Sequence, residues 1–175
     1  MKVLVVVDMQ KDFVDGALGS KEALSIVPNV SKKIKEYQKE DALIIFTRDT
    51  HFDNYLETQE GNKLPVAHCI KDTLGWEIVP ELDTTNSLII DKLSFGSTDL
   101  PKLIKDELDK KATSLESIEL VGLCTDICVI SNALYLKANF IETPIYVDEA
   151  CCAGVSKESH QNALEAMKMC QINIM

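Results

Sequence analysis

The sequence SIELVGLCTDICVISNA, from Ser117 to Ala133, joins a strand pattern directly to a helix pattern. Its apolar, β-branched run stops at Gly122, a pattern typical of a buried strand. Thr125 and Asp126 follow as candidate helix N-caps, and a periodic apolar segment begins at Cys128. The pattern therefore predicts that Cys128 lies in the first turn of a helix, at the carboxyl end of a strand. Backbone N–H groups and the helix dipole favour a thiolate at such a position.

Length and composition indicate one globular domain over residues 1–175. The chain is 46% hydrophobic and 26% charged, which is enough for a sizeable core. Its net charge of −10 argues against nucleic acid or an anionic membrane as a partner. No apolar run reaches the roughly 18 residues of a membrane span, and the start of the chain lacks the pattern of a signal peptide. We therefore expect a cytoplasmic protein whose cysteines are reduced.

Apolar runs that alternate with helical spacing predict a parallel sheet covered by helices. The expected strands are residues 2–7, 42–47, 87–90, 118–121, 145–147 and 172–175. The expected helices are residues 30–37, 76–82, 99–110, 128–138 and a last helix capped by Ser156. Residues 52–71 are predicted to be a long irregular segment, which in a compact domain is usually functional. The alternation predicts an α/β fold, a three-layer α/β/α sandwich of Rossmann type on a mostly parallel six-stranded sheet.

Ligands in parallel α/β folds bind at the carboxyl ends of the strands, so the residues there are candidates for function. They are all reactive or ligating types: Asp8, Asp49, His51, Lys92, Cys128 and Asp148. Each also has a structural explanation on its own, since a cysteine can be a small buried residue and an aspartate can cap a turn. Their expected convergence at one edge of the sheet favours a catalytic site.

The Cys128 thiol needs activation, because an ordinary cysteine is only a few per cent thiolate at pH 7. A Lys92 ammonium about 4 Å away would favour the thiolate by about 4 kcal/mol, or roughly three pKa units. Asp8 at the same distance would cancel much of this effect and could instead accept the thiol proton. We expect the neighbouring Cys124 to matter through its backbone N–H, not through its sulfur.

Asp49, His51 and His68 are candidate metal ligands. Two imidazoles and a carboxylate suit a borderline metal such as zinc, although the spacing is loose and scattered surface histidines are the alternative. The third histidine, His160, is expected to be structural. Phe13 is a candidate wall of an apolar pocket or a core residue.

Several motifs together resemble the isochorismatase-like cysteine hydrolases, and most of all their nicotinamidase (pyrazinamidase) branch. The motifs are VVVDMQKDF, TRDTH, PVAHC, Lys92 and GLCTDICV, and the likeness runs from residue 3 to about residue 170. The resemblance implies a catalytic triad of Asp8, Lys92 and Cys128. It also implies a cis peptide between Leu123 and Cys124 and an oxyanion hole made by the backbone N–H groups of Cys124 and Cys128.

The same resemblance implies a metal, a pocket and a partner. The metal would be zinc, with iron or manganese as substitutes, and its implied ligands are Asp49, His51 and His68, with Glu60 as an additional ligand or close neighbour. Phe13 and Leu64 are expected to line the substrate pocket. The implied substrate is a small amide, and a homo-oligomer is expected.

One segment departs from the family pattern and keeps a second hypothesis open. Nicotinamidases commonly carry Trp-Pro-x-His-Cys, whereas residues 64–69 here read LPVAHC, without the tryptophan and with one residue inserted. The leading hypothesis is hydrolysis of nicotinamide to nicotinate and ammonia through a Cys128 thioester. The second is hydrolysis of another small amide, ureido or carbamoyl compound.

Two further alternatives are weaker. Vinyl-ether hydrolysis of isochorismate belongs to a branch that does not use a nucleophilic cysteine. A receiver-like signalling domain, with Asp49 as phosphoacceptor, would explain the acidic residues and the lysine at the strand ends. Such domains are shorter, and Asp8 lacks the adjacent acidic residue that they carry.

Overall fold

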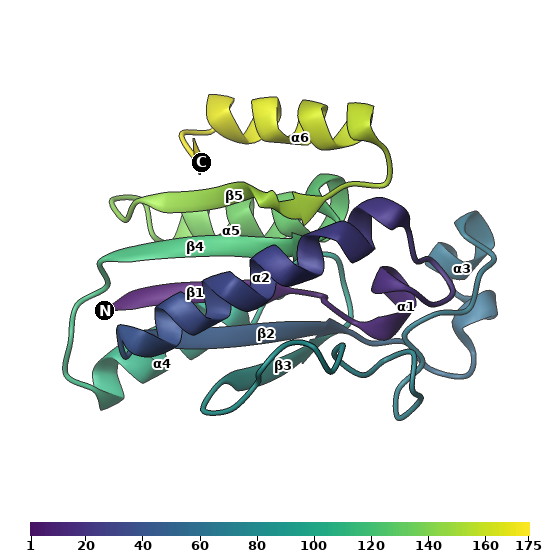
Figure 1. Cartoon of the computed structure of the whole chain (residues 1–175), viewed down its shortest axis with the longest axis horizontal. Coiled ribbons are helices and arrows are strands. Elements are labelled where there is room, and N and C mark those ends of the chain that lie inside the picture. The colour runs from purple at the N-terminus through teal and green to yellow at the C-terminus, as the bar shows by residue number, and fades with distance from the viewer.

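The computed structural model describes residues 1–175 and contains one sheet of six parallel strands. The strands are β1 (Lys2–Val7), β2 (Leu43–Asp49), β3 (Leu88–Lys92), β4 (Ser117–Leu123), β5 (Ile145–Ala153) and β6 (Asn173–Ile174). Their order is β3-β2-β1-β4-β5-β6, so the chain builds outward from β1 to one edge and then crosses to the other (Figure 1). The predicted parallel six-stranded sheet is confirmed.

Helices cover both faces of this sheet (Figure 1). One face carries α2 (Lys21–Lys39), and the other carries α4 (Leu100–Lys110), α5 (Ile130–Asn139) and α6 (Lys157–Met169). The residues of β1 alternate between the two cores: Val5 packs with the residues of α4, α5 and α6, whereas Leu4 and Val6 pack with those of α2. This alternation of fully buried residues produces the three predicted layers.

Helix α2 is longer than predicted. It begins directly after Ser20, whose side chain accepts a hydrogen bond from the backbone N–H of Ala23, and it passes through Pro28. The prediction was too short because a proline usually interrupts a helical pattern. The predicted cap of the last helix is confirmed, since Ser156 and Ser159 form a reciprocal capping box at the start of α6.

Two other predicted segments were wrong. Residues 76–82 form turns and not a helix, and Ile78 pairs with Gln10 in an isolated antiparallel bridge. The segment 52–71 is not wholly irregular, because it contains the short helices η1 (Tyr55–Glu57) and α3 (Gln59–Lys63). Backbone N–H groups of α1 (Lys11–Val14) bond to the carbonyls of Gly75 and Glu77, and these tertiary contacts override the local pattern at the start of the first segment.

Strand β5 continues six residues beyond its predicted end at Val147. Its pairing with β4 shifts register between Leu120 and Gly122, and regular pairing resumes where Cys152 lies opposite Gly122. Asp148 therefore lies inside a bulged strand, where its carboxylate pairs with Lys33 of α2 at 2.9 Å. The expectation that Asp148 joins the other residues at the strand ends was wrong, because a bulge carries the strand past this acidic residue.

Gly122 allows the end of β4 to approach the end of β1. Its φ of +117° is a conformation that side chains rarely adopt, and a Cβ atom here would lie 2.1 Å from the carbonyl oxygen of Val7. The two strands consequently deliver Asp8 and Cys124, the next residues along each chain segment, to the same small region.

Candidate active site

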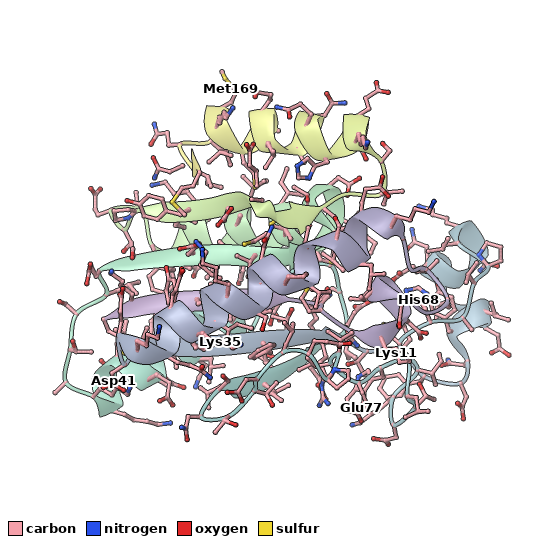
Figure 2. All side chains as sticks on the ribbon, viewed as in Figure 1. Lys11, Lys35, Asp41, His68, Glu77 and Met169 are labelled. Atoms are coloured by element: carbon pink, nitrogen blue, oxygen red, sulfur yellow. The ribbon has the colours of Figure 1, made fainter.

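The carboxyl ends of the strands meet at the end of the molecule where α1 and α3 lie (Figure 1). His68 lies at this end, together with Lys11 and Glu77, whereas Asp41 marks the opposite end (Figure 2). A cavity of about 700 Å³ opens here, and its lining includes Cys124 and Cys128 beside Phe13 and Leu64. This volume is typical of a small-molecule site.

Three of the predicted residues converge at the floor of this end. Asp8 is fully buried and turns the chain at the end of β1 with a φ of +48°. Its Oδ2 lies 2.7 Å from the Nζ of Lys92, and its Oδ1 accepts a hydrogen bond of 2.6 Å from the Thr47 hydroxyl. The same Nζ lies 3.0 Å from Oδ1 of Asp49 and 3.5 Å from Sγ of Cys128. The structure thus brings Asp8, Lys92 and Cys128 together.

The electrostatics of the thiol differ from the simplest expectation. Burial raises the pKa of Cys128 well above its ordinary value, and the Asp8 carboxylate raises it further, while Lys92 only partly opposes them. Lys92 cannot favour the thiolate as strongly as expected, because its charge is shared between Asp8 and Asp49. Burial and the neighbouring carboxylate thus favour the thiol form of Cys128, which was the other arrangement that the sequence left open.

The pKa values of the two neighbouring groups follow from the same burial and the same charges. Burial raises the pKa of Asp8, and the nearby Lys92 ammonium offsets part of that effect. Burial alone would lower the pKa of Lys92, but the surrounding Asp8, Cys128 and Asp49 outweigh it and raise this pKa instead. A carboxyl with a raised pKa can take up and release a proton near neutral pH more readily than an exposed one.

A second group of side chains lies beside the first. One ligand atom from each of four residues lies within 4.8 Å of the others, and the four are Asp49, His51, Glu60 and His68. Nε2 of His51 is 3.0 Å from Asp49 and 3.7 Å from Glu60. Nε2 of His68 is 3.9 Å from Asp49 and 4.0 Å from Glu60. Helix α3, which was not predicted, brings Glu60 into this group.

These four residues fit a divalent cation. Nδ1 of His68 bonds to the carbonyl oxygen of Val66 at 2.8 Å, so this nitrogen carries the proton and Nε2 keeps its lone pair toward the group. Nε2 of His51 is buried and, although it lies 3.0 Å from Asp49, it makes no well-aligned hydrogen bond. Ligand atoms that each lie about 2 Å from a zinc ion are about 3 to 4 Å from one another, which matches this spacing.

Aromatic rings support the two imidazoles. The ring of Phe13 is 5.4 Å from that of His68, and the ring of Tyr55 lies 4.6 Å from His51 and 5.0 Å from His68. The Tyr55 hydroxyl also donates a hydrogen bond of 2.9 Å to the carbonyl of Leu64. Leu64 and Phe13 both line the cavity. Their positions are linked to the candidate metal ligands, because Leu64 bonds to Tyr55 and Phe13 packs against His68.

Two polar residues of the DMQKDF motif were not assigned roles from the sequence. The fully buried Gln10 side chain accepts from the backbone N–H of Asp49 at 2.7 Å and donates to its carbonyl at 2.8 Å. Asp12 accepts a 2.8 Å hydrogen bond from the backbone N–H of Cys69, the residue after His68. The sequence signal for these roles was the cluster of polar residues directly after a buried strand. Their hydrogen-bond partners could not be predicted, because they lie far away in the sequence.

The cis peptide that the resemblance implied between Leu123 and Cys124 is confirmed. The turn that follows differs from the prediction, because Cys128 lies in η2 (Thr125–Val129), a π-helical turn that precedes α5. Thr125 and Asp126 are not side-chain N-caps, since Thr125 Oγ1 bonds to Nδ1 of His160 at 2.8 Å and Asp126 accepts from the N–H of Val155 at 3.1 Å. The two side chains thus connect η2 to Val155, just before α6, and to His160, in the first turn of α6.

Comparison with known proteins gives consistent matches along the whole chain. The family model described as the isochorismatase domain matches residues 2–175. The chain is 28% identical over 191 residues to the nicotinamidase/pyrazinamidase of Mycobacterium tuberculosis, covering 99% of this chain and 98% of that protein.

Solved structures agree with the sequence matches. The pyrazinamidase of Pyrococcus horikoshii in complex with zinc superposes with a TM-score of 0.85 and 30% identity, covering 99% of this chain and 98% of that one. The pyrazinamidase/nicotinamidase of Streptococcus mutans has a TM-score of 0.83 and 25% identity, with full coverage of both chains.

None of the helices is long and apolar enough to cross a membrane. The six-stranded parallel sheet, the buried Asp8–Lys92–Cys128 group and the match over residues 2–175 lead to one assignment. This chain belongs to the isochorismatase domain family.

Proposed function

We propose that this protein is a metal-assisted cysteine amidohydrolase that converts nicotinamide and water to nicotinate and ammonia. The observation that carries the proposal is the Cys128 thiol, which lies beside Asp8 and Lys92 and lines the same cavity as the four candidate metal ligands. The similar proteins named nicotinamidase or pyrazinamidase support this choice of substrate.

The first half of the reaction forms a thioester. Asp8 takes the proton from Cys128, and Sγ attacks the carboxamide carbon. The backbone N–H groups of Cys124 and Cys128 hold the negative oxygen of the tetrahedral intermediate, a contribution of about 3 to 4 kcal/mol per donor in comparable sites. Asp8 then gives its proton to the departing nitrogen, so that ammonia leaves and the acyl group stays on the sulfur.

The second half returns the enzyme to its starting state. Asp8 accepts a proton from a water molecule, whose oxygen attacks the thioester carbonyl. The carbon–sulfur bond breaks, nicotinate forms, and the proton held by Asp8 returns to the Cys128 sulfur. Lys92, whose side chain is 1% exposed, favours the carboxylate form of Asp8 before each proton transfer and keeps Asp8 next to the thiol.

The cofactor in this proposal is a divalent cation, with zinc first and iron or manganese as substitutes. Held by Asp49, His51, Glu60 and His68, it would supply a Lewis-acidic position for the ring nitrogen of the substrate. Phe13 and Leu64 bound the space beside it and exclude water from the ring. A reducing compartment such as the cytoplasm suits the six free cysteines, and size-exclusion chromatography with light scattering tests the expected homo-oligomer.

Ammonia release from nicotinamide by the purified, zinc-loaded protein tests the proposal. We expect turnover by the wild type, none by Cys128→Ala, and a nicotinoyl adduct on the Cys128 peptide after rapid acid quenching. Full activity of Cys128→Ala would exclude the thioester mechanism.

The second candidate is a related cysteine hydrolase for a non-aromatic amide, ureido or carbamoyl compound. It is favoured by Leu64, an aliphatic residue that lines the cavity in the segment where nicotinamidases commonly carry tryptophan. An aromatic stacking partner is worth about 1 kcal/mol, so its absence weakens the preference for a ring. Comparing kcat/KM for nicotinamide with a panel of carbamoyl and ureido compounds separates the two candidates.

A further inference from the structure

We propose that Asn132 is a positioning residue that sets the distance between Cys128 and Lys92. Asn132 lies in the second turn after the nucleophile, and its side chain is fully buried. Its Nδ2 donates to the carbonyl oxygen of Cys128 at 2.8 Å and to that of Phe95 at 3.3 Å. Its Oδ1 accepts from the backbone N–H of Ser97 at 2.9 Å. The proposal rests on the proposed function, because it concerns the same thiol.

The orientation of this amide is determined by its partners. The Ser97 N–H can only donate, and the carbonyl groups of Cys128 and Phe95 can only accept. A flipped amide would place oxygen against two carbonyl oxygens and nitrogen against an N–H group. Asn132 therefore connects two backbone segments in one defined geometry.

These two segments carry different parts of the active site. Phe95 and Ser97 belong to the connection that begins directly after Lys92, the last residue of the edge strand β3. Cys128 follows β4, and β1 and β2 lie between the two strands in the sheet. No ladder of backbone hydrogen bonds joins β3 to β4, so the 3.5 Å approach of Lys92 Nζ to Cys128 Sγ depends on contacts beyond the strand ends.

The packing around Asn132 supports a close-fitting connection. A Cβ atom on Gly96 would lie 3.3 Å from the backbone of Ser131, so the connection after β3 rests directly on α5. Ser97 is 3% exposed, and Leu93, Ser94 and Phe95 line the cavity. Loss of the Asn132 amide would leave buried backbone groups of both segments without partners, and the segments would separate to find water.

Replacement of Asn132 by aspartate tests this inference. The variant keeps the shape and the acceptor for Ser97 but places oxygen against the carbonyls of Cys128 and Phe95. A displacement of about 1 Å at a reacting group costs about 100-fold in rate, so we expect kcat to fall by about 10- to 100-fold with KM within threefold. We also expect a shifted pH profile for alkylation of Cys128 by iodoacetamide, followed by peptide mass spectrometry. The uncharged variant Gly96→Ala separates the effect of the distance to Lys92 from that of the added carboxylate charge.

The chain offers a matched control in the same helix. Asn139 makes the same contact to the carbonyl four residues earlier, from Nδ2 to Tyr135 at 2.9 Å, but it is partly exposed and does not line the cavity. Asn139→Asp should leave both kcat and the alkylation profile unchanged. Gly96→Ala adds only a methyl group against Ser131 and removes no buried polar group. It should shift both readouts in the same direction as Asn132→Asp, by a smaller amount, and it keeps the test valid if Asn132→Asp does not fold.

An unchanged alkylation profile and kcat in folded Asn132→Asp, or in Gly96→Ala where Asn132→Asp does not fold, would overturn the positioning role, even if thermal stability fell. The alkylation readout needs no substrate. If the wild type fails to hydrolyse nicotinamide, the proposed function fails, while the relation between Asn132 and the Cys128 thiol is still measured.

Discussion

Two lysines in this protein each bridge two carboxylates with a cysteine close by. In the strand-end cluster, made by Asp8, Asp49, Lys92 and Cys128, the Lys92 ammonium lies 2.7 Å and 3.0 Å from its two carboxylates.

In the α2 cluster, made by Lys33, Glu119, Asp148 and Cys151, the Lys33 ammonium lies 2.8 Å and 2.9 Å from Glu119 and Asp148. The sulfur of Cys151 is 3.4 Å from Asp148. The residue types and distances of the two clusters are therefore almost the same.

The two clusters differ in their position on the sheet. The strand-end cluster lies where β1, β2 and β3 stop and where the cavity opens, and imidazoles adjoin it. The α2 cluster lies against the face of the sheet covered by α2, where the Tyr37 hydroxyl also bonds to Glu119, and none of its members lines the cavity. A lysine, two carboxylates and a thiol become a reactive site only where a substrate can reach them. In the other place they fasten a helix to the sheet.

The largest expected difference between the clusters is in their cysteines. Cys128→Ala should lower kcat for nicotinamide hydrolysis by at least about 10⁴-fold, since removal of a nucleophile leaves only binding and the oxyanion donors. Cys151→Ala should leave kcat within about twofold of the wild type, because the Cys151 sulfur has no access to the substrate. Steady-state ammonia release measures both. Comparable losses in the two variants would contradict the comparison.

The lysines should separate activity from stability. Lys92→Met should lower kcat/KM by about 10²- to 10⁴-fold, because it leaves the Asp8 base without its partner. Lys33→Met should keep kcat/KM within about threefold but lower the free energy of unfolding by about 1 to 3 kcal/mol, since it leaves Glu119 and Asp148 facing each other partly buried. Urea unfolding and steady-state kinetics on both variants check this, and a catalytic loss in Lys33→Met would count against a purely structural role.

Metal content should depend on the histidines that adjoin the strand-end cluster and not on the α2 cluster. The protein should hold about one divalent cation per chain, and His51→Ala should lower that content and reduce kcat by at least about tenfold. Chelation followed by dialysis should do the same to the wild type, with recovery on zinc addition. Asp148→Asn serves as the control, because it removes a carboxylate of the α2 cluster. Elemental analysis of each purified variant measures the content, and full metal loading of His51→Ala would exclude its role as a ligand.

The smallest expected effect is in the acid dependence of stability. Burial would raise the pKa of Asp148, but the hydrogen bond and charge of Lys33 outweigh it and hold this pKa below its ordinary value. The folded state therefore binds this proton less readily than the unfolded state. The resulting stabilisation is present above pH 4 or so and is lost as the pH falls through the lowered pKa.

Asp148→Asn should therefore reduce the loss of stability at acid pH, by up to about 1 kcal/mol in the free energy of unfolding. Asp8 should act with the opposite sign, because burial raises its pKa and its contribution to stability is lost as the pH rises. Urea unfolding of Asp8→Asn and Asp148→Asn between pH 3 and pH 6 measures, for each variant, the slope of the free energy of unfolding against pH. Equal slopes in the two variants would contradict a raised pKa for Asp8 beside a lowered pKa for Asp148.

Local residue patterns predict the architecture and most of the candidate residues. Its β-branched runs are long enough to specify buried parallel strands, and short motifs after those runs carry Asp8, Asp49, Lys92 and Cys128 to one edge. Leu64 and Phe13 were also expected at the cavity that they line. These features are local, because they depend on the period of the side chains and on which residue follows a strand.

How those residues are held and charged depends on the tertiary structure. Asp148 pairs with Lys33 because of a bulge in β5, and Glu60 lies near the histidines because of helix α3. Asn132 connects the segment of Cys128 to the segment that follows Lys92. Burial also raises the pKa of Cys128, against the expected effect of Lys92. Each of these depends on distances between segments far apart in the chain and on the removal of water, and neither quantity is encoded in a local pattern of residues.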